Sequence, residues 1–156
     1  MKHVLIAYFS ASGVTAKAAQ EMAKATGAAL YEIVPAEPYT AADLDWRDAG
    51  SRSTREMRDP ACRPAIAPPA ADLAQYDTVL IGFPIWWYVE PRIVDTFLES
   101  HDFTGKTVIP FATSGGSGMD RAEKSLHERC ASARWEKGGL VNGPGAADWA
   151  RRALHL

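Results

Sequence analysis

Hydroxyl side chains gather in a short loop near the start of the chain, where they could hold a phosphate group. Ser10, Ser12, Gly13 and Thr15 fall within six positions. A helical pattern begins at Val14, and the free backbone N–H groups and partial positive charge of a helix N-terminus favour anions. The hydroxyl groups can add further donors to a phosphate dianion. The alternative interpretation is that Ser12 or Thr15 only caps the helix.

Aromatic residues cluster at a second point in the chain, shortly after Pro84. Trp86, Trp87 and Tyr88 are adjacent, and they lie just beyond the end of an apolar run, so their side chains need not all belong to the core. A flat heteroaromatic ring would stack well on such a surface. The alternative is that one tryptophan packs inward and the other two side chains cap the sheet.

A third loop, residues 113–118, consists of glycine and hydroxyl residues. Its three glycines allow the backbone to approach a flat ligand closely, because they carry no Cβ atom. The three loops therefore offer phosphate binding, ring stacking and close backbone contact.

The chain must bring these loops together through the elements that precede and follow them. Apolar runs predict strands at 4–9, 28–34, 77–83, 107–112 and 133–141. Helical patterns lie at 14–26, from 91 onward, at 119–131 and at 146–154. This alternation predicts an α/β fold, a three-layer α-β-α sandwich around a parallel sheet. Because ligands bind beyond the carboxyl ends of such strands, we expect the three loops to meet there.

Two segments depart from this regular alternation. Pro110 lies inside the fourth apolar run, and we expect a bulge or an early end to strand pairing there. Residues 35–72 form a long excursion with six prolines and five arginines, and with short helices expected near 40–48 and 53–58. Trp46 could anchor this excursion to the domain. Its arginines form either a solvated face or a cover over a cofactor or partner.

Composition excludes several classes of protein. The 156 residues fit one domain, and a net charge of −2 indicates neither a nucleic-acid partner nor an anionic membrane surface. No apolar run approaches the roughly 18 residues of a membrane span. Because the first strand begins directly after Met1 and Lys2, we expect no signal peptide and a cytoplasmic location. The two cysteines and four histidines show no metal-ligand spacing, so we expect free thiols and no metal site.

The three loops resemble those of a known family. Ser10-Ala-Ser-Gly-Val-Thr15 resembles the T/S-x-T/S-G-x-T phosphate loop of the flavodoxin family, which binds flavin mononucleotide (FMN). The segment from Pro84 to Pro91 resembles the flavin-ring loop of flavodoxin-like quinone reductases, and residues 113–118 resemble their third flavin loop. The resemblance covers almost the whole strand–helix frame, and it is closest to the small single-domain flavodoxins.

This resemblance implies a five-stranded parallel sheet in the order 2-1-3-4-5 and a bound FMN. It assigns the phosphate to Ser10, Ser12, Gly13, Val14 and Thr15. It assigns the flavin ring to Pro84, Ile85, Trp86, Trp87 and Tyr88, with Trp87 as the best stacking residue. It assigns the pyrimidine edge of the ring to the backbone of Thr113, Ser114, Gly115, Gly116, Ser117 and Gly118.

The resemblance also implies a redox function, in which the protein carries electrons through the flavin to a redox partner protein. The alternative is a small NAD(P)H:quinone-type oxidoreductase, and a homodimer is possible in either case. The net charge of −2 is smaller than that of acidic electron carriers. A third reading is a non-redox domain that binds another phosphate ligand. We name no catalytic acid or base, and Glu90, near the expected ring edge, is equally well interpreted as a solvated turn residue.

Overall fold

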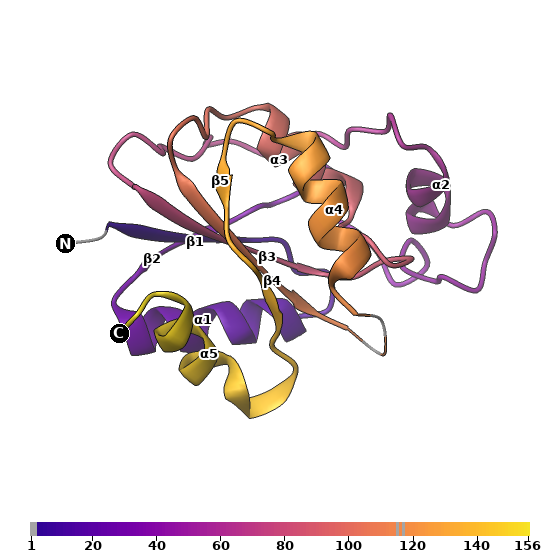
Figure 1. Cartoon of the computed structure of the whole chain (residues 1–156). Coiled ribbons are helices and arrows are strands. Elements are labelled where there is room, and N and C mark those ends of the chain that lie inside the picture. The colour runs from indigo at the N-terminus through magenta and orange to yellow at the C-terminus, as the bar shows by residue number, and fades with distance from the viewer. Residues whose placement is uncertain (1–2, 115, 117) are drawn as a thin grey trace.

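A twisted parallel sheet runs through the centre of the computed structural model, which describes residues 3–114, 116 and 118–156 (Figure 1). Its strands are β1 (Val4–Tyr8), β2 (Ala29–Glu32), β3 (Thr78–Pro84), β4 (Thr107–Thr113), β5 (Arg134–Trp135) and β6 (Gly139–Leu140). The order across the sheet is β2-β1-β3-β4-β5, and β6 also pairs with β4. The predicted order 2-1-3-4-5 is therefore confirmed.

Helices cover both faces of this sheet, as the alternation of elements predicts. The helices are α1 (Val14–Thr26), α2 (Arg52–Arg58), α3 (Arg92–Glu99), α4 (Asp120–Arg129) and α5 (Ala146–Ala153). Figure 1 shows α1 and α5 on one face and α3 and α4 on the other, whereas α2 lies apart in the excursion. The three-layer arrangement is therefore confirmed.

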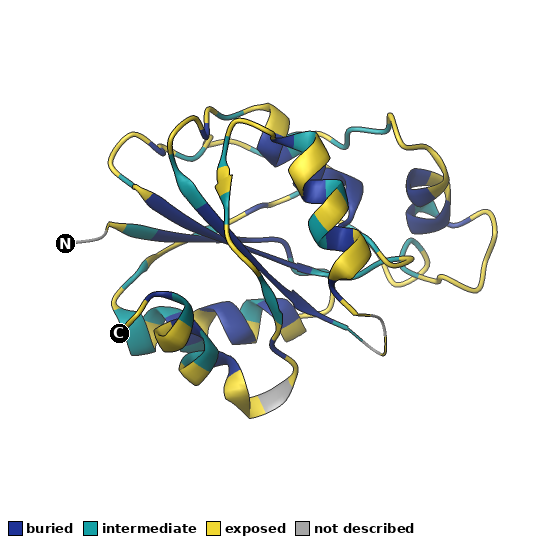
Figure 2. Ribbon diagram, viewed as in Figure 1, coloured by how far each residue is buried: buried dark blue, intermediate teal, exposed yellow. Residues whose placement is uncertain are grey.

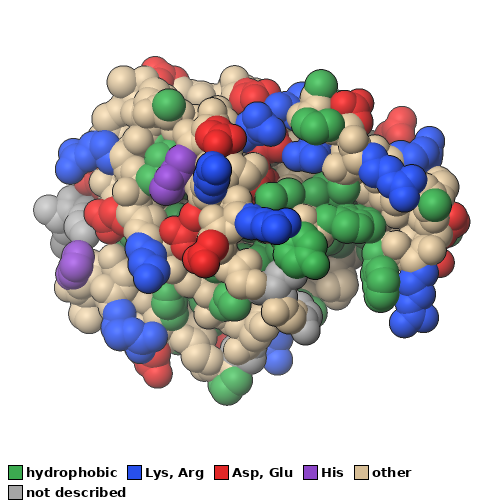
Figure 3. All heavy atoms as spheres, turned by 45° about the vertical axis from the view of Figure 1, so that its right-hand side comes forward, with side chains coloured by type: hydrophobic (Ala, Val, Ile, Leu, Met, Phe, Trp, Pro, Cys, Tyr) green, Lys and Arg blue, Asp and Glu red, His purple; other side chains and the backbone are tan. Residues whose placement is uncertain are grey.

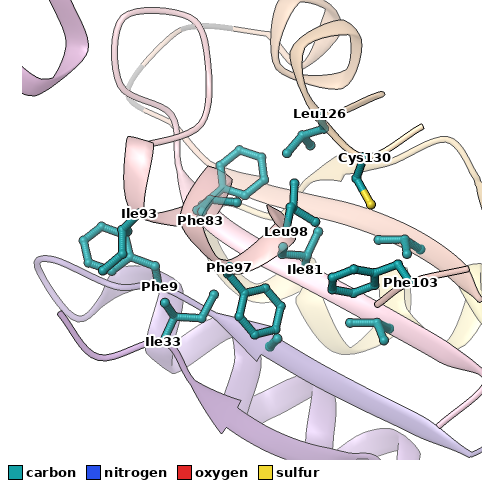
Figure 4. Close-up of a cluster of buried hydrophobic side chains, with 14 of the residues drawn as sticks. Phe9, Ile33, Ile81, Phe83, Ile93, Phe97, Leu98, Phe103, Leu126 and Cys130 are labelled. Atoms are coloured by element: carbon teal, nitrogen blue, oxygen red, sulfur yellow. The ribbon is translucent and has the colours of Figure 1, made fainter. Parts of the chain in front are cut away.

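Alternate residues of each central strand contribute to opposite halves of the core. In β1, Leu5 and Ala7 pack toward the α3 and α4 side, whereas Ile6 and Tyr8 pack toward the α1 and α5 side. This is the two-sided burial that an apolar run in a parallel sheet requires. Figure 2 shows the buried strands between exposed outer helix faces, and Figure 4 shows the cluster around Phe97. The core holds the carboxyl ends of β1, β3 and β4 in fixed positions.

Pro110 interrupts the sheet on one side only. Its pairing with Ile81 of β3 continues without a bulge. On the other side, two short strands take the place of one fifth strand: β5 pairs with residues 107–108 of β4, and β6 pairs with residues 111–112. A Cβ atom on Gly138 would lie 2.2 Å from the Pro110 carbonyl oxygen, so only glycine fits at this close approach. The expected early end to pairing therefore occurs toward the last strand, whose single run at 133–141 becomes two short pieces.

The excursion is closed at its base and contains one helix. Pro35 forms an antiparallel bridge with Ile66, which brings the two ends of the loop together. The helix expected near 53–58 is α2, but the one expected near 40–48 is wrong, since residues 41–44 form turns. Aspartates explain the difference: the side chains of Asp45 and Asp48 accept hydrogen bonds from backbone N–H groups two residues ahead, which favours turns over a helix.

Candidate functional site

The three predicted loops meet at the carboxyl ends of β1, β3 and β4. The hydroxyl groups of Thr15 and Thr113 lie 2.8 Å apart, which joins the first loop to the third. The N–H of Ile85 donates to the carbonyl oxygen of Thr113 over 2.9 Å, which joins the second loop to the third. A cavity of about 460 Å³ lies among them, lined by Ser12, Val14, Pro84, Ile85, Trp86, Thr113, Ser114 and Asn142.

The first loop leaves the N-terminus of α1 without a side-chain cap. Gly13 occupies the N-cap position with φ +93°, a left-handed conformation that favours glycine, and no side chain caps the helix there. Ser10 instead stabilises the loop, because its Oγ accepts a hydrogen bond from Gly13 N–H over 3.1 Å. The interpretation that Ser12 or Thr15 only caps the helix is therefore wrong. The uncapped helix end suits an anion, and Ser12 is exposed beside it.

Thr15 differs from Ser12 in its position. It is only 1% exposed, and its hydroxyl bonds to that of Thr113, with either oxygen able to donate. When Thr113 is the donor, the Thr15 proton stays available for a phosphate oxygen. Lys17, which was not among the predicted site residues, lines a neighbouring cavity of about 550 Å³ together with Ser12 and Gly13. Its spacing of one helical turn from Gly13 is the signal that could have identified it.

The aromatic loop is a tight, strained turn. Trp86 and Val89 exchange two backbone hydrogen bonds, of 2.9 and 3.2 Å. The two residues between them have positive φ angles, 48° at Trp87 and 74° at Tyr88. This pair of angles fits a type I′ turn, which normally carries asparagine or glycine at both central positions. Holding two bulky residues in this region costs about 1–3 kcal/mol each.

The two strained residues expose their aromatic side chains. Trp87 is 42% exposed and Tyr88 is 53% exposed, so neither gains the full stabilisation of burial. Trp86 instead packs edge-on against Phe9 and Tyr39, with ring centroids 5.7 and 5.6 Å away. The interpretation in which one tryptophan packs inward is therefore correct for Trp86, and Trp87 and Tyr88 stay available for a ligand.

The first part of the third loop, Ser114, is held by a residue from a later turn. The Asn142 side chain accepts a hydrogen bond from Ser114 N–H over 2.8 Å and donates one to its carbonyl oxygen over 2.5 Å. The Ser114 N–H is thus already engaged within the protein. Gly116 and Gly118 are exposed, whereas the predicted positions Gly115 and Ser117 lie outside the described residues. Asn142 was not among the predicted site residues.

A buried pair of acids lies directly after the aromatic turn. Glu90 and Asp95 are both fully buried, so the interpretation of Glu90 as a solvated residue is wrong. Burial and the neighbouring Asp95 raise the pKa of Glu90 to about 9. Its Oε2 accepts a hydrogen bond from Ser125 over 2.8 Å, while Oε1 and both Asp95 oxygens find no N–H or O–H donor among the described groups. A proton on Glu90 that is shared with Asp95 gives a partner to Oε1 and to one of the two Asp95 oxygens.

Arginines complete the surroundings of this acid pair. Burial raises the pKa of Asp95, and the nearby arginines oppose that rise. Arg92 and Arg129 lie 3.7 and 3.8 Å from its Oδ2, on different helices. Arg92 also donates to the carbonyl oxygen of Met57 over 2.8 Å, which ties the end of α2 to the start of α3.

The excursion contacts the aromatic turn through Tyr39. Its hydroxyl donates to Glu56 over 2.5 Å, and the Arg52 guanidinium lies 3.8 Å from its ring centroid. The same ring packs against Phe9 and Trp86. Trp46 is 66% exposed, so the expectation that it anchors the excursion is wrong, and Tyr39 does so instead.

Comparisons with known proteins identify the family of this chain. A family profile described as flavodoxin matches residues 3–153. The chain belongs to the flavodoxin family. A provisionally named flavoprotein from Bacteroides uniformis ATCC 8492 is 51% identical over 99% of both chains, with a TM-score of 0.92. A second one, from Bacteroides eggerthii DSM 20697, is 46% identical over 99% of this chain and 97% of its own, with a TM-score of 0.94.

A more distant flavodoxin-like structure is a flavoprotein of Lactobacillus acidophilus NCFM in complex with FMN. It is 22% identical over 96% of this chain and 99% of its own, with a TM-score of 0.78, and the similarity shows the shared fold. A search of curated proteins returned no match. Among the described residues, no group of acids, histidines and cysteines could hold a metal ion. None of the helices in that part of the chain has the length and apolar character to cross a bilayer.

Proposed function

We propose that this flavodoxin family member binds FMN and carries electrons through it. The uncapped N-terminus of α1 suits the phosphate, and the exposed Ser12 can add a donor. The aromatic turn offers Trp87 and Tyr88 to the ring. The third loop offers exposed backbone at Gly118, whereas the Gly116 N–H already donates to the Ser114 hydroxyl over 3.1 Å. These residues fit a ligand with a dianionic end and a flat heteroaromatic end.

The cofactor supplies the redox chemistry, and the protein supplies binding and electrostatics. The Asn142 side chain holds Ser114 at the start of the third loop in place, so the backbone of this residue need not be ordered when the ligand binds. The hydrogen bond between Thr15 and Thr113 fixes the distance between the phosphate end and the ring end of the site. The side chain of Trp86, packed against Phe9, forms a rigid wall behind the aromatic turn.

The observation that carries this proposal is the strain at Trp87 and Tyr88. Two large aromatic residues occupy backbone angles that disfavour them, and both remain about half exposed. Strained, exposed residues of this kind are typical of ligand-binding sites. A surface turn without a ligand would normally carry asparagine or glycine at these two positions.

Flavin titration tests the proposal. Purified protein should bind FMN with saturable quenching of flavin fluorescence, and it should bind riboflavin more weakly because riboflavin lacks the phosphate. The Trp87→Ala variant should bind FMN about 2–10-fold more weakly, from a stacking energy of about 0.5–1.5 kcal/mol. A protein that binds a nucleotide phosphate but no flavin would support the non-redox reading and overturn this one.

A second candidate function is a small oxidoreductase that uses NAD(P)H. The observation that favours it is a cavity of about 380 Å³ between Trp46 and the aromatic turn, which leaves room for a small acceptor next to the residues offered to the flavin ring. Anaerobic mixing of the FMN-loaded protein with NADH or NADPH decides between the candidates. Rapid bleaching of the flavin supports a reductase, whereas bleaching only by a chemical reductant supports a carrier.

A further inference from the structure

One face of α4 contacts both the aromatic turn and the two buried acids that follow it. Three side chains spaced four positions apart lie along this face, because four residues make about one helical turn. Their contacts are, in order, Arg121 at 4.8 Å from the Tyr88 ring centroid, Ser125 donating to Glu90 over 2.8 Å, and Arg129 at 3.8 Å from Asp95. The turn and the acid pair therefore share one supporting helix.

The aromatic turn is held at both ends by buried groups. At its entry, the Trp86 ring packs edge-on against two neighbouring aromatic rings. At its exit, Glu90 follows the turn directly and is fully buried. Between these ends, the exposed rings of Trp87 and Tyr88 lie on the face where Figure 3 shows hydrophobic side chains gathered in a recess. The strained pair thus depends on what holds Trp86 and Glu90.

Contacts through α2 join the two ends of the turn. On the exit side, Arg92 lies 3.7 Å from Asp95 and donates to the Glu56 carbonyl oxygen over 3.3 Å. On the entry side, the Tyr39 hydroxyl donates to the Glu56 carboxylate over 2.5 Å, and the Tyr39 ring packs against Trp86. A displacement of the acid pair therefore reaches the turn from both sides.

The acid pair needs a proton to keep its place in this arrangement. Three of its four carboxylate oxygens have no N–H or O–H donor among the described groups. Arg92 and Arg129 approach Asp95 only to 3.7 and 3.8 Å, which is beyond hydrogen-bond distance. Two charged carboxylates buried side by side without donors repel each other, whereas one shared proton removes a charge and supplies a donor.

The groups around the pair decide where the proton resides. The charged or titratable neighbours are Arg92 on α3, Arg129 on α4, and Glu56, Cys62 and Arg63 of the excursion. Glu56 and Arg63 are each engaged in an ion pair of their own, at 2.9 and 2.7 Å. Burial raises the pKa of both acids, Asp95 raises that of Glu90 further, and the arginines oppose the rise at Asp95. The proton therefore resides on Glu90 and the negative charge on Asp95.

We propose that the Glu90–Asp95 pair, joined by one proton, positions the aromatic turn for flavin binding, so that flavin affinity falls when the pair loses this proton. This inference rests on the proposed function. Both acids are positioning residues, because they act through the turn. When the proton leaves, the two charges repel each other and displace the exit of the turn. Because coupling between two sites is reciprocal, a flavin that prefers the protonated pair must in turn raise the pKa of Glu90.

The pH dependence of riboflavin affinity tests this coupling. Riboflavin has no phosphate, so the ionisation of that group does not enter. With Glu90 half protonated at about pH 9 and an about tenfold preference of the ligand for the protonated pair, the dissociation constant should rise about threefold between pH 7 and 9.5. Glu90→Gln stays neutral throughout, so its dissociation constant should follow only the ionisation of the flavin ring. Circular dichroism of the same samples checks that each protein is folded.

Carbon-13 NMR of the Glu90 carboxyl group gives a readout on the protein without flavin. Apoprotein labelled with [δ-¹³C]glutamate should show a resonance that titrates near pH 9 and is missing in Glu90→Gln. Saturating riboflavin should move this midpoint upward by about one pH unit, which corresponds to the tenfold preference. A purely structural role of the pair would leave the midpoint where it is.

Two variants of α4 provide a second test and a control. Ser125→Ala removes the hydrogen bond that favours the charged form of Glu90, so the midpoint should move upward even without ligand. The rise in its riboflavin dissociation constant should then begin at a correspondingly higher pH, which keeps the test decisive if Glu90→Gln does not fold. Glu128→Gln changes an exposed glutamate on the same helix and should alter neither measurement.

The outcomes distinguish this inference from the proposed function. The same pH dependence of riboflavin binding in Glu90→Gln and in the unmodified protein would overturn the inference and leave flavin binding standing. A Glu90 midpoint that riboflavin does not move would do the same. A protein that binds no flavin at pH 7 would overturn the proposed function and this inference with it.

Discussion

Replacing Trp87 with glycine and, separately, with alanine measures the strain in the aromatic turn. Both changes remove the same side-chain contacts, so they differ only in the backbone. At an ordinary position glycine is less stable than alanine by about 0.5–1 kcal/mol. At φ 48° alanine meets the left-handed penalty of about 1–2 kcal/mol, so we expect Trp87→Gly to be the more stable variant by about 1 kcal/mol.

Denaturant unfolding of each apoprotein measures its free energy of unfolding, and the two values can be compared when the variants have the same m-value. A thermal scan should show the same order, with a gap of roughly 2–4 °C for about 1 kcal/mol in a domain of this size. The matched pair is Trp46→Gly and Trp46→Ala, because Trp46 is exposed and has no positive φ, and there alanine should be the more stable.

The same variants separate strain from ligand binding. Both Trp87 variants lose the indole ring, so FMN affinity should fall to a similar degree in each. If Trp87→Gly proves no more stable than Trp87→Ala, the turn is not strained in the free protein, and the reasoning from strain to ligand fails.

Three further changes address other parts of the site. Ser12→Ala should weaken FMN but not riboflavin, because hydrogen bonds to a charged group contribute about 1.5–3 kcal/mol; equal losses would exclude Ser12 from the phosphate site. Asn142→Ala should weaken FMN binding by freeing Ser114, and Asn142→Asp, which keeps the acceptor for Ser114 N–H, should retain more affinity in the same titration. Glu90→Gln should remove a pH dependence of stability. Because the folded pKa of Glu90 is raised from 4.5 to about 9, the folded state holds its proton more tightly, and the free energy of unfolding should fall as pH rises between these values. The wild-type slope reaches at most about 1.4 kcal/mol per pH unit, and denaturant melts at pH 5.5 and 8 should show a flatter dependence for Glu90→Gln; equal slopes would place the proton elsewhere.

The strand–helix frame could be predicted because its signals are local. Uncharged apolar runs such as 78–83 and helix formers after Gly13 determine their own structure, and the family resemblance supplied the strand order. The meeting of the three loops followed from parallel strands alone. The positions of Trp86 and Trp87 could not be predicted in the same way, because both are tryptophans and only the φ angles of the turn send one inward and the other outward.

The remaining differences between the predicted and the observed site come from contacts between distant parts of the chain. Glu90 is buried because α3 and α4 bring Asp95 and Ser125 to it, and no local pattern marks that arrangement. Asn142 lies 28 positions after Ser114, and only the packing of the last strand brings them together. Such contacts depend on tertiary structure, so residue type and spacing do not identify them.

The two short strands β5 and β6 beside Pro110 also affect whether this edge of the sheet can pair with a strand from another molecule. A sheet edge recruits a foreign strand when it offers a continuous row of free N–H and C=O groups. Here β5 and β6 contribute two residues each, and residues 136–138 between them belong to no strand. An incoming strand finds too few consecutive partners to stay in register. The interruption opposite Pro110 thus makes this edge of the sheet a poor template for a strand from another molecule.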